Sequence, residues 1–273
     1  MSTSRTVLIC HRGDDFDEKG LASWLASFTN LAGIVVIAEA AAPAFFRRLQ
    51  YERRRIGVYR LLDVLAFRVF YKFRYARTDS AWMRRTAQML EVMYPMAKPT
   101  PQVLVTDDPN SRAAQEFIQS LKPDLAIARC KKILRKSVFS IPTYGTFVLH
   151  PGICPEYRNA HGCFWALARG DKENVGVTLL KIDAGIDTGP VHGYYSYRNA
   201  CRGDSHLRIQ YRVVLDNLPA IKSKLEEILQ GKSAPLAIIN RASQVYGQPW
   251  LSMYGSFKQH LGELCRREES EQM

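Results

Sequence analysis

The run Phe147-Val148-Leu149-His150-Pro151-Gly152 decides the fold. A second segment acts together with it downstream, Asp183-Ala184-Gly185-Ile186-Asp187-Thr188-Gly189. The apolar residues before His150 have strand composition, and the proline and glycine after it end that strand at once. His150 is therefore predicted at a strand tip. Ligands of open α/β sheets bind outside the carboxyl ends of the strands, so a titratable imidazole there is a candidate for chemistry. A histidine with a purely structural role is the alternative.

A second apolar run, 177–182, also has strand composition and leads directly into a loop that contains Asp183 and Asp187. Both carboxylates can then face a ligand beside His150. A carboxylate next to an imidazole raises the imidazole pKa and fixes its orientation, which suits acid–base catalysis. Alone, the spacing Asp-Xaa-Gly-Xaa-Asp-Thr-Gly also fits an ordinary Asx turn. The two segments are therefore interpreted together.

Together these segments resemble the folate-dependent formyltransferases, the family of glycinamide ribonucleotide, methionyl-tRNA and amino-sugar N-formyltransferases. The matching pieces are His150 to Arg158, Phe164 to Leu167 with Gly170-Asp171, Gly176 to Thr178, and Asp183 to Gly189, in an order and spacing that agree from Pro101 to Val191. The resemblance implies an α/β, doubly wound, mostly parallel sheet, with the family histidine on His150 and the family aspartate on Asp187. The family asparagine, two residues before the histidine, is replaced by Val148, which has no hydrogen-bonding side chain.

The missing asparagine leaves the developing charge on the formyl oxygen without its usual donor. Asn159 and His161 are candidate replacements because both can donate a hydrogen bond. His11, at the tip of the first predicted strand, is a candidate substrate contact. The resemblance implies 10-formyltetrahydrofolate as formyl donor, held by the turn after the strand at 125–128 and by the loop after 182. The residues implied in its binding are Arg129, Cys130, Lys131, Ile133, Asp183, Gly185 and Ile186.

The composition is that of an ordinary soluble domain, with 273 residues of which 47% are apolar. No apolar run has the length of a transmembrane segment or a signal peptide, so a cytoplasmic protein is expected. The six cysteines include no Cys-x-x-Cys pair, which disfavours a zinc site and a disulfide framework and predicts free thiols and no metal. The first turn, 11–15, lacks the glycine pattern that binds a dinucleotide.

The chain is predicted to form a formyltransferase-like catalytic domain at 1–195, with a basic helical insertion at about 43–99. A helical or irregular C-terminal extension follows at 196–273. The main predicted helices outside the insertion are 17–28, 111–121 and 207–229, the last with Pro219 near its middle. Predicted strands lie at 6–10, 31–38, 103–106, 125–128, 146–149, 177–182 and 192–197.

The predicted insertion is strongly basic. From Arg47 to Arg77 it carries ten cationic residues against Glu52 and Asp63, interleaved with aromatic and aliphatic side chains. Most of the formal net charge of +12 lies there. Such a segment can rest on an anionic membrane surface, bind nucleic acid or pair with a second copy in a homodimer. Alternatively, it packs its apolar face on its own domain and turns its arginines to solvent.

The sequence therefore predicts transfer of a formyl group from 10-formyltetrahydrofolate to a primary amine. An amino sugar or a similar small phosphorylated metabolite is the preferred acceptor, because cations suit phosphate. The segment after 236 is also too short for the β-barrel domain of transfer-RNA formyltransferases. The alternatives are a hydrolase of the same fold, a folate-binding relative that lost catalysis with its asparagine, and a nucleic-acid or membrane-surface module.

Overall fold

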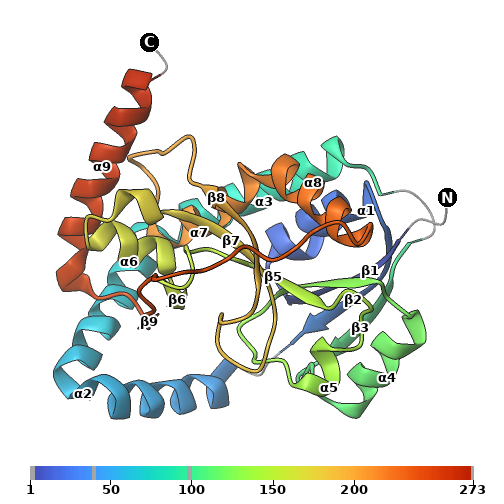
Figure 1. The fold of residues 1–273 in the computed structure, drawn as a ribbon. Helices are drawn as coiled ribbons and strands as arrows, with labels where there is room; N and C mark the ends of the chain where they lie inside the picture. Colours follow the sequence, from blue (N-terminus) through green and yellow to red (C-terminus); the bar gives the residue numbers. More distant parts are fainter. Residues whose placement is uncertain (1–3, 39–40, 97–99, 272–273) are drawn as a thin grey trace.

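The computed structural model describes residues 4–38, 41–96 and 100–271, without the side chains of 41–49, 51 and 271 (Figure 1). Its centre is a seven-stranded sheet in the order β3-β2-β1-β4-β5-β7-β8. Strands β1 to β5 run parallel, whereas β7 is antiparallel to both β5 and β8. This confirms the predicted α/β, mostly parallel fold class. The strands are β1 (Arg5–His11), β2 (Asn30–Ile37), β3 (Gln102–Thr106), β4 (Leu125–Arg129), β5 (Thr146–His150), β7 (Gly176–Lys181) and β8 (Val191–Ser196).

Helices cover both faces of this sheet (Figure 1). They are the π-helix η1 (Phe16–Leu21), α1 (Ala22–Ala26), α2 (Ala41–Arg74), α3 (Ala76–Met93), α4 (Arg112–Leu121), α5 (Lys136–Phe139), α6 (Gly162–Ala168), α7 (His206–Leu215), α8 (Leu218–Leu229) and α9 (Tyr254–Glu271), with the short 3₁₀ turns η2 (Lys172–Asn174) and η3 (Leu251–Met253). The short strands β6 (Arg158–Asn159) and β9 (Val245–Tyr246) pair separately from the main sheet.

The alternation of side chains along β1 shows how the two layers form. Leu8 points into the larger core with residues of η1, α1, α3 and α6 to α9, whereas Val7 and Ile9 point into a smaller core with residues of α4 and α5. Successive residues of a strand face opposite sides of a sheet. A central strand that is buried on both faces therefore reads as the continuous apolar run seen at 7–10.

The predicted helix at 207–229 is wrong in one respect, because the structure has two helices there, α7 and α8. Pro219 lies in the first turn of α8, where the missing N–H of proline costs nothing. The insertion is also two helices. In α2 the backbone bends at Gly57, which has a φ of 76°, a value that glycine adopts at little cost. The predicted end of the insertion, at 97–99, lies outside the described residues.

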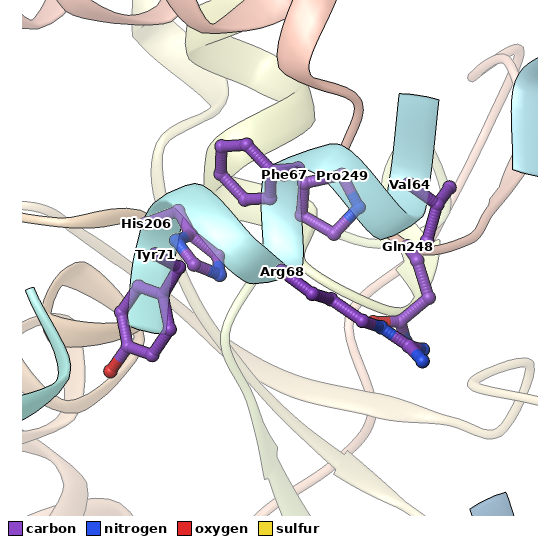
Figure 2. A pocket seen from close by; sticks show the side chains of 7 residues that line it. All are labelled: Val64, Phe67, Arg68, Tyr71, His206, Gln248 and Pro249. Atoms are coloured by element: carbon purple, nitrogen blue, oxygen red, sulfur yellow. The ribbon is translucent and has the colours of Figure 1, made fainter. Parts of the chain in front are cut away.

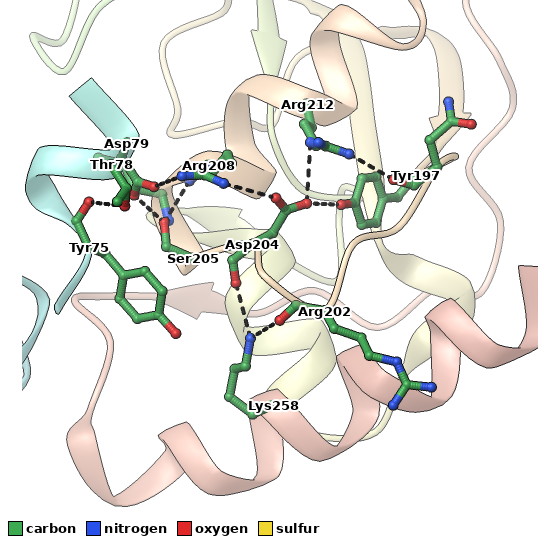
Figure 3. Close-up of polar contacts among 12 residues, drawn as sticks. Tyr75, Thr78, Asp79, Tyr197, Arg202, Asp204, Ser205, Arg208, Arg212 and Lys258 are labelled. Atoms are coloured by element: carbon green, nitrogen blue, oxygen red, sulfur yellow. Dashed lines mark hydrogen bonds and ion pairs between the residues drawn. The ribbon is translucent and has the colours of Figure 1, made fainter. Parts of the chain in front are cut away.

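A buried polar network fastens the insertion to the rest of the fold (Figure 3). Asp79 of α3 accepts from the Ser205 hydroxyl and pairs with Arg208 of α7, with 2.8 Å between Nη2 and Oδ1. Asp204, the residue before Ser205, accepts from the Tyr197 hydroxyl at 2.5 Å. Breaking one member of such a network leaves buried groups unpaired, so these contacts fix α3 against α7.

The sheet order also locates the site. The chain builds outward from β1 through β2 to β3 and then returns to place β4 on the other side of β1. Ligands of open α/β sheets bind at such a reversal, outside the carboxyl ends of the strands. His11 and Arg129 are the last residues of β1 and β4, and His150 is the last residue of β5. All three therefore lie along one edge of the sheet.

Candidate active site

His150 is buried at the tip of β5 and both of its ring nitrogens have protein partners. Nδ1 lies 3.4 Å from Oδ2 of Asp187, and Nε2 lies 2.8 Å from the carbonyl oxygen of Tyr157. Burial lowers the pKa of His150, but the Asp187 carboxylate, Cys154 and the Tyr157 carbonyl together raise it by more, and the pKa is raised to about 9. Near neutral pH the ring is therefore an imidazolium that donates to Tyr157 and faces a carboxylate.

Asp187 reaches His150 because its loop folds back along the sheet. The strand β7 ends at Lys181, which pairs with Phe147 at the beginning of β5, so the loop leaves from the edge opposite to His150. Asp183 shapes the return: its Oδ1 accepts from the Gly185 N–H at 2.9 Å and from the Thr188 hydroxyl at 2.8 Å. The structure thus brings Asp187 to the imidazole and uses Asp183 as an Asx turn.

A second contact holds Asp187 in place. The backbone N–H of Asn159, in β6, donates to Oδ2 of Asp187 at 2.7 Å, and Arg158 donates to the carbonyl oxygen of Ile186 at 3.1 Å. The side-chain amide of Asn159 donates elsewhere, to the carbonyl oxygen of Tyr246. Asn159 therefore supports the pair of His150 and Asp187 through its backbone N–H. Its side-chain amide binds Tyr246 and does not take the predicted role of donor to the formyl oxygen.

The close packing around His150 leaves room only for glycine at two positions. A Cβ on Gly152 would lie 2.9 Å from Nε2 of His150 and 2.8 Å from the carbonyl oxygen of Tyr157. A Cβ on Gly162 would lie 2.6 Å from the Cα of Gly152. Real Cβ atoms do not approach other atoms this closely, so the two backbones can pack beside the imidazole only as glycines. The sequence reasoning missed this, although glycines that follow His150 and His161 so closely were a usable signal.

This arrangement lies within a segment that is similar to a known family. Residues 85–206, which include His150, Asp187 and both glycines, match the formyl transferase family. The match covers less than half of the chain.

The similarity to individual formyltransferases is local. The methionyl-tRNA formyltransferase of Dehalococcoides mccartyi (strain CBDB1) is 44% identical over 79 residues, which are 29% of this chain and 25% of that protein. That of Thermosynechococcus vestitus is 32% identical over 136 residues, or 49% of this chain and 36% of that protein. The chain thus spans between a quarter and about a third of the length of these relatives.

The fold similarity is broader. The crystal structure of phosphoribosylglycinamide formyltransferase from Anaplasma phagocytophilum superposes with a TM-score of 0.53 and 15% identity, over 85% of this chain and 89% of that one. A sugar N-formyltransferase from Shewanella sp. gives a TM-score of 0.51 and 14% identity, over 89% of this chain and 76% of that one. Both comparisons establish the formyltransferase fold.

Within this formyltransferase fold, Val148 stands on the strand face that carries His150, since residues two apart in a strand face the same way. Val148 is partly buried and packs against an apolar cluster of Cys154, Leu180 and Val191. Tyr194, which also packs there, donates its hydroxyl hydrogen to the carbonyl oxygen of Cys154 at 2.7 Å. The position for which the resemblance implies an asparagine is therefore an apolar contact here.

His161 does not join His150. Its Nδ1 pairs with the side-chain amide of Gln210 at 2.9 Å, and its ring lies 5.2 Å from that of His206, centroid to centroid. Burial, followed by the positive charges of Lys131 and Arg68, lowers the pKa of His161 to about 3. His161 is therefore a neutral imidazole near neutral pH.

A small cavity of about 80 Å³ lies beside this second histidine cluster (Figure 2). It opens between the inner side of α2, the start of α7 and the loop before η3. Its walls combine aromatic rings with an imidazole, a guanidinium and a side-chain amide, which is the mixed lining of small-molecule sites. The lining residues are Val64, Phe67, Arg68, Tyr71, His206, Gln248 and Pro249.

The turn after β4, assigned to the folate by resemblance, is held in shape by two side chains. His11 accepts the backbone N–H of Lys131 at 2.9 Å. Asn110 donates to the carbonyl oxygen of Ile133 at 3.0 Å and accepts the N–H of Arg135 at 2.7 Å. The Ile133 side chain projects outward and is 69% exposed. His11 thus acts on the protein's own backbone, and the sequence reasoning missed Asn110.

The Arg129 side chain turns inward. Its Nε lies 3.0 Å from Oδ1 of Asp17, and its Nη1 donates to the carbonyl oxygen of Leu149 at 2.8 Å. Burial raises the pKa of Asp17 to about 7 against the opposing effect of Arg129, and burial likewise raises the pKa of the Cys130 thiol to about 12. Arg129 therefore positions the residue before His150. The aspartates after the first strand were the signal for this buried pair.

Three further findings bear on the predicted chemistry. All six cysteines are free thiols, as predicted. Over residues 4–38, 41–96 and 100–271, no cluster of three or more histidine, cysteine or acidic side chains is arranged to hold a metal ion. In that same part of the chain no helix is both long and apolar enough to cross a bilayer.

Proposed function

We propose that this protein transfers a formyl group from 10-formyltetrahydrofolate to a primary amine. The observation that carries the proposal is the pair of His150 and Asp187, with 3.4 Å between Nδ1 and Oδ2, at the carboxyl edge of the sheet. Both residues lie in the segment that matches the formyl transferase family. The fold and the location of both residues in the matched segment support formyl transfer over unrelated uses of such a pair.

The turn after β4 fits a folate. A pterin is a flat ring system with alternating donors and acceptors, which is best matched by backbone groups held in a fixed order. His11 and Asn110 provide that order by fixing the backbone of Lys131, Ile133 and Arg135. The exposed Ile133 side chain adds apolar surface for a ring. Bound there, the folate would supply an activated formyl group near the tip of β5.

Formyl transfer forms one bond and breaks one bond at the formyl carbon. The amine lone pair forms a bond to the formyl carbon, and the bond between that carbon and the folate nitrogen breaks. One proton leaves the amine and one reaches the folate nitrogen. Negative charge builds up on the formyl oxygen before the second bond breaks, and a fixed positive charge nearby lowers that barrier.

The geometry suits His150 to supply this charge. Its pKa of about 9 keeps the ring protonated near neutral pH, so it stabilises an oxyanion or donates a proton and does not act as a base. Asp187 sustains that charge and, with the Asn159 N–H on its Oδ2 at 2.7 Å, keeps a fixed orientation. The proton lost by the amine is then taken by Asp187, directly or through water.

The acceptor proposed is the amine of an amino sugar or a similar small phosphorylated metabolite. Arg68 and Lys131 lie close enough to His161 for their charges to lower its pKa, so the region between the turn after β4 and the cavity on α2 is positive. Positive groups with neutral imidazoles and amides beside them suit a phosphate and the hydroxyls of a sugar.

The test is to incubate the protein with 10-formyltetrahydrofolate and a panel of amino sugars in free, phosphorylated and nucleotide-linked forms. Mass spectrometry then detects the formamide product and absorbance detects tetrahydrofolate. His150→Ala should abolish transfer, whereas His260→Ala, a histidine of α9, should leave it intact. Formate released without an acceptor would identify a hydrolase instead. Equal turnover of both variants would remove His150 from the mechanism.

A folate-binding protein without catalysis is the second candidate, and two observations favour it. Val148 brings no donor to the formyl oxygen, and both ring nitrogens of His150 already have partners, Asp187 and the Tyr157 carbonyl. Tight binding of a folate measured by calorimetry, together with no transfer to any amine of the panel, would establish this alternative.

A further inference from the structure

The second half of α2, after the bend at Gly57, has one apolar face directed inward. Leu61, Val64 and Phe67 are buried there. The ring of Phe67 packs against those of Phe164 and His206, with centroids 5.6 Å and 4.7 Å away. This face accounts for the attachment of the helix to its own domain, so nothing more is needed on the opposite face for folding.

The opposite face is apolar as well. Tyr59, Leu62, Val69 and Phe73 are 90%, 58%, 57% and 84% exposed, and Ala66 between them is also exposed. We call these five residues the outer stripe. Their spacing of three and four residues places them along one side of a helix. In Figure 1 α2 forms a bent arm on the outside of the molecule, away from α4 and α5. An exposed apolar patch of this kind marks an interaction surface.

The exposed charged residues of α2 from residue 50 onward and of the start of α3 are cations. Arg53, Arg54, Lys72, Arg74 and Arg77 are all exposed on α2 and the start of α3. The segment from 47 to 77 contains only two acidic residues, and neither offsets these cations on the surface. The first, Glu52, is buried and pairs with Arg55, with 3.0 Å between Nη2 and Oε2.

The other acidic residue, Asp63, is also taken up by the fold. Its Oδ1 accepts the backbone N–H of Ser252 at 3.0 Å and its Oδ2 accepts the Ser252 hydroxyl at 2.5 Å. Nearby, the Arg60 guanidinium lies over the Trp250 ring, 4.2 Å from its centroid. These contacts fasten α2 to the loop around η3, and the network of Figure 3 fastens α3. The stripe is therefore presented on a fixed helix.

Three occupants would cover an apolar stripe with a cationic border. A second copy of the chain would pair stripe with stripe, but the outer stripe extends over only two heptads, short of the three or four that sustain a coiled coil, and it would bring like charges together. Nucleic acid stacks its bases on aromatic rings, whereas Leu62 and Val69 lie between Tyr59 and Phe73. An anionic lipid surface matches both features, since acyl chains receive the stripe and headgroups receive the cations.

We propose that α2 binds the surface of an anionic membrane through its outer stripe, with the helix lying in the plane of the lipid headgroups. The protein is then a peripheral membrane protein whose attachment depends on both lipid charge and apolar burial. The inner face of the same helix carries Arg68 and Tyr71 into the cavity of Figure 2, so the attachment also sets the orientation of that cavity toward the lipid surface.

The test measures co-sedimentation of the full-length protein with vesicles of equal parts phosphatidylglycerol and phosphatidylcholine, and with vesicles of phosphatidylcholine alone. The protein should sediment with the anionic vesicles only and should be released by high salt. The double variant Leu62→Ser/Phe73→Ser and the double variant Arg53→Gln/Arg54→Gln should each weaken the partition by roughly tenfold or more.

Matched control variants change exposed residues outside α2 and α3. Val103→Ser/Ile239→Ser removes two side chains that are 58% and 72% exposed, and Arg112→Gln/Lys136→Gln removes two exposed cations of α4 and α5. Both should bind vesicles as the wild type does, and circular dichroism should show all four double variants folded.

Three results would overturn the proposal. Equal binding to neutral and anionic vesicles would remove the role of the cations. Equal loss of binding in the control variants would show a general charge or hydrophobicity effect. Absence of vesicle binding, combined with a dimer in light scattering that Leu62→Ser/Phe73→Ser dissociates or with RNA binding that Arg53→Gln/Arg54→Gln weakens, would assign the stripe to another partner.

Discussion

His150 and His161 lie at the two ends of the connection between β5 and α6, and their surroundings give them opposite charge. Both rings are largely shielded from solvent, which by itself disfavours the charged form of an imidazole. His150 faces the Asp187 carboxylate and its pKa is raised to about 9. His161 has Lys131 and Arg68 nearby and amides at its nitrogens, and its pKa is lowered to about 3. The charges near each ring, and not its burial, therefore account for the difference between the two pKa values.

The two shifts affect stability in opposite directions. A histidine with a raised pKa stabilises the folded state below its unfolded value of about 6.5, and this stabilisation is lost as the pH rises through the folded value. The stabilisation that His150 provides is therefore lost as the pH rises from about 6.5 to about 9. A histidine with a lowered pKa destabilises the fold on acidification, because the unfolded chain binds the proton first. His161 acts in that way between about pH 6.5 and about 3.

The largest expected effect comes from removing the charge that distinguishes His150. Asp187→Asn should reduce formyl transfer by about 10² or more, the range of positioned acid–base groups, and the pKa of His150 should fall. Steady-state rates on the acceptor found by the amine panel provide the measurement. Asp183→Asn makes the same charge change in the same loop and should cost less, because an amide oxygen still accepts from Gly185 and Thr188. Equal losses in the two variants would contradict a specific role for Asp187.

The sequence predicted the pairing of His150 with the Asp183–Gly189 loop, because strand composition and loop length follow local rules. It did not predict which aspartate would face the imidazole. That depends on the Asx turn of Asp183 and on the Asn159 N–H, and Asn159 is brought there by the pairing of β6 with β9, two strands far apart in the chain. The predicted donor roles of Asn159 and His161 rest on chemical type alone, whereas the Tyr246 carbonyl and Gln210 take up these groups in the structure.

The fold was predictable to a larger extent, since buried strands leave apolar runs in the sequence. The helix predicted across Pro219 failed because apolar periodicity continues through the break between α7 and α8. For the basic insertion, the expectation that it packs on its own domain describes only one face of α2. Periodicity could not separate Leu61, Val64 and Phe67 from the outer stripe, because both faces are apolar and only the tertiary structure shows which is covered.

A smaller effect is expected at His161. His161→Gln keeps a hydrogen-bonding side chain and removes the titration, so the variant should lose less stability on acidification than the wild type. Between about pH 7 and pH 5 the free energy of unfolding of the wild type should fall by about 1–2 kcal/mol more than that of the variant. This range allows for the partial exposure of the His161 ring. Urea unfolding at both pH values measures it. Parallel losses in wild type and variant would show that the neutral state of His161 is not enforced by the fold.

The smallest effect is expected at Val148. Val148→Asn places an amide against Cys154, Leu180 and Val191, which form an apolar cluster. Transfer should stay flat or fall, and unfolding experiments should show a modest destabilisation from the buried amide. A clear gain of transfer, with the wild type inactive on the same amines, would instead favour the folate-binding protein that lost catalysis, because one oxyanion donor is worth about 10²–10³ in rate.

The central claim is that Asp187 holds His150 as a cation, and the most direct measurement is a pH titration of the histidine side chains by ¹⁵N NMR, with His150 assigned through His150→Gln. Both ring nitrogens of His150 should be protonated at neutral pH and should titrate at about 9, and Asp187→Asn should lower this value while His161 stays neutral. A His150 ring that is neutral at neutral pH in the wild type would contradict the account.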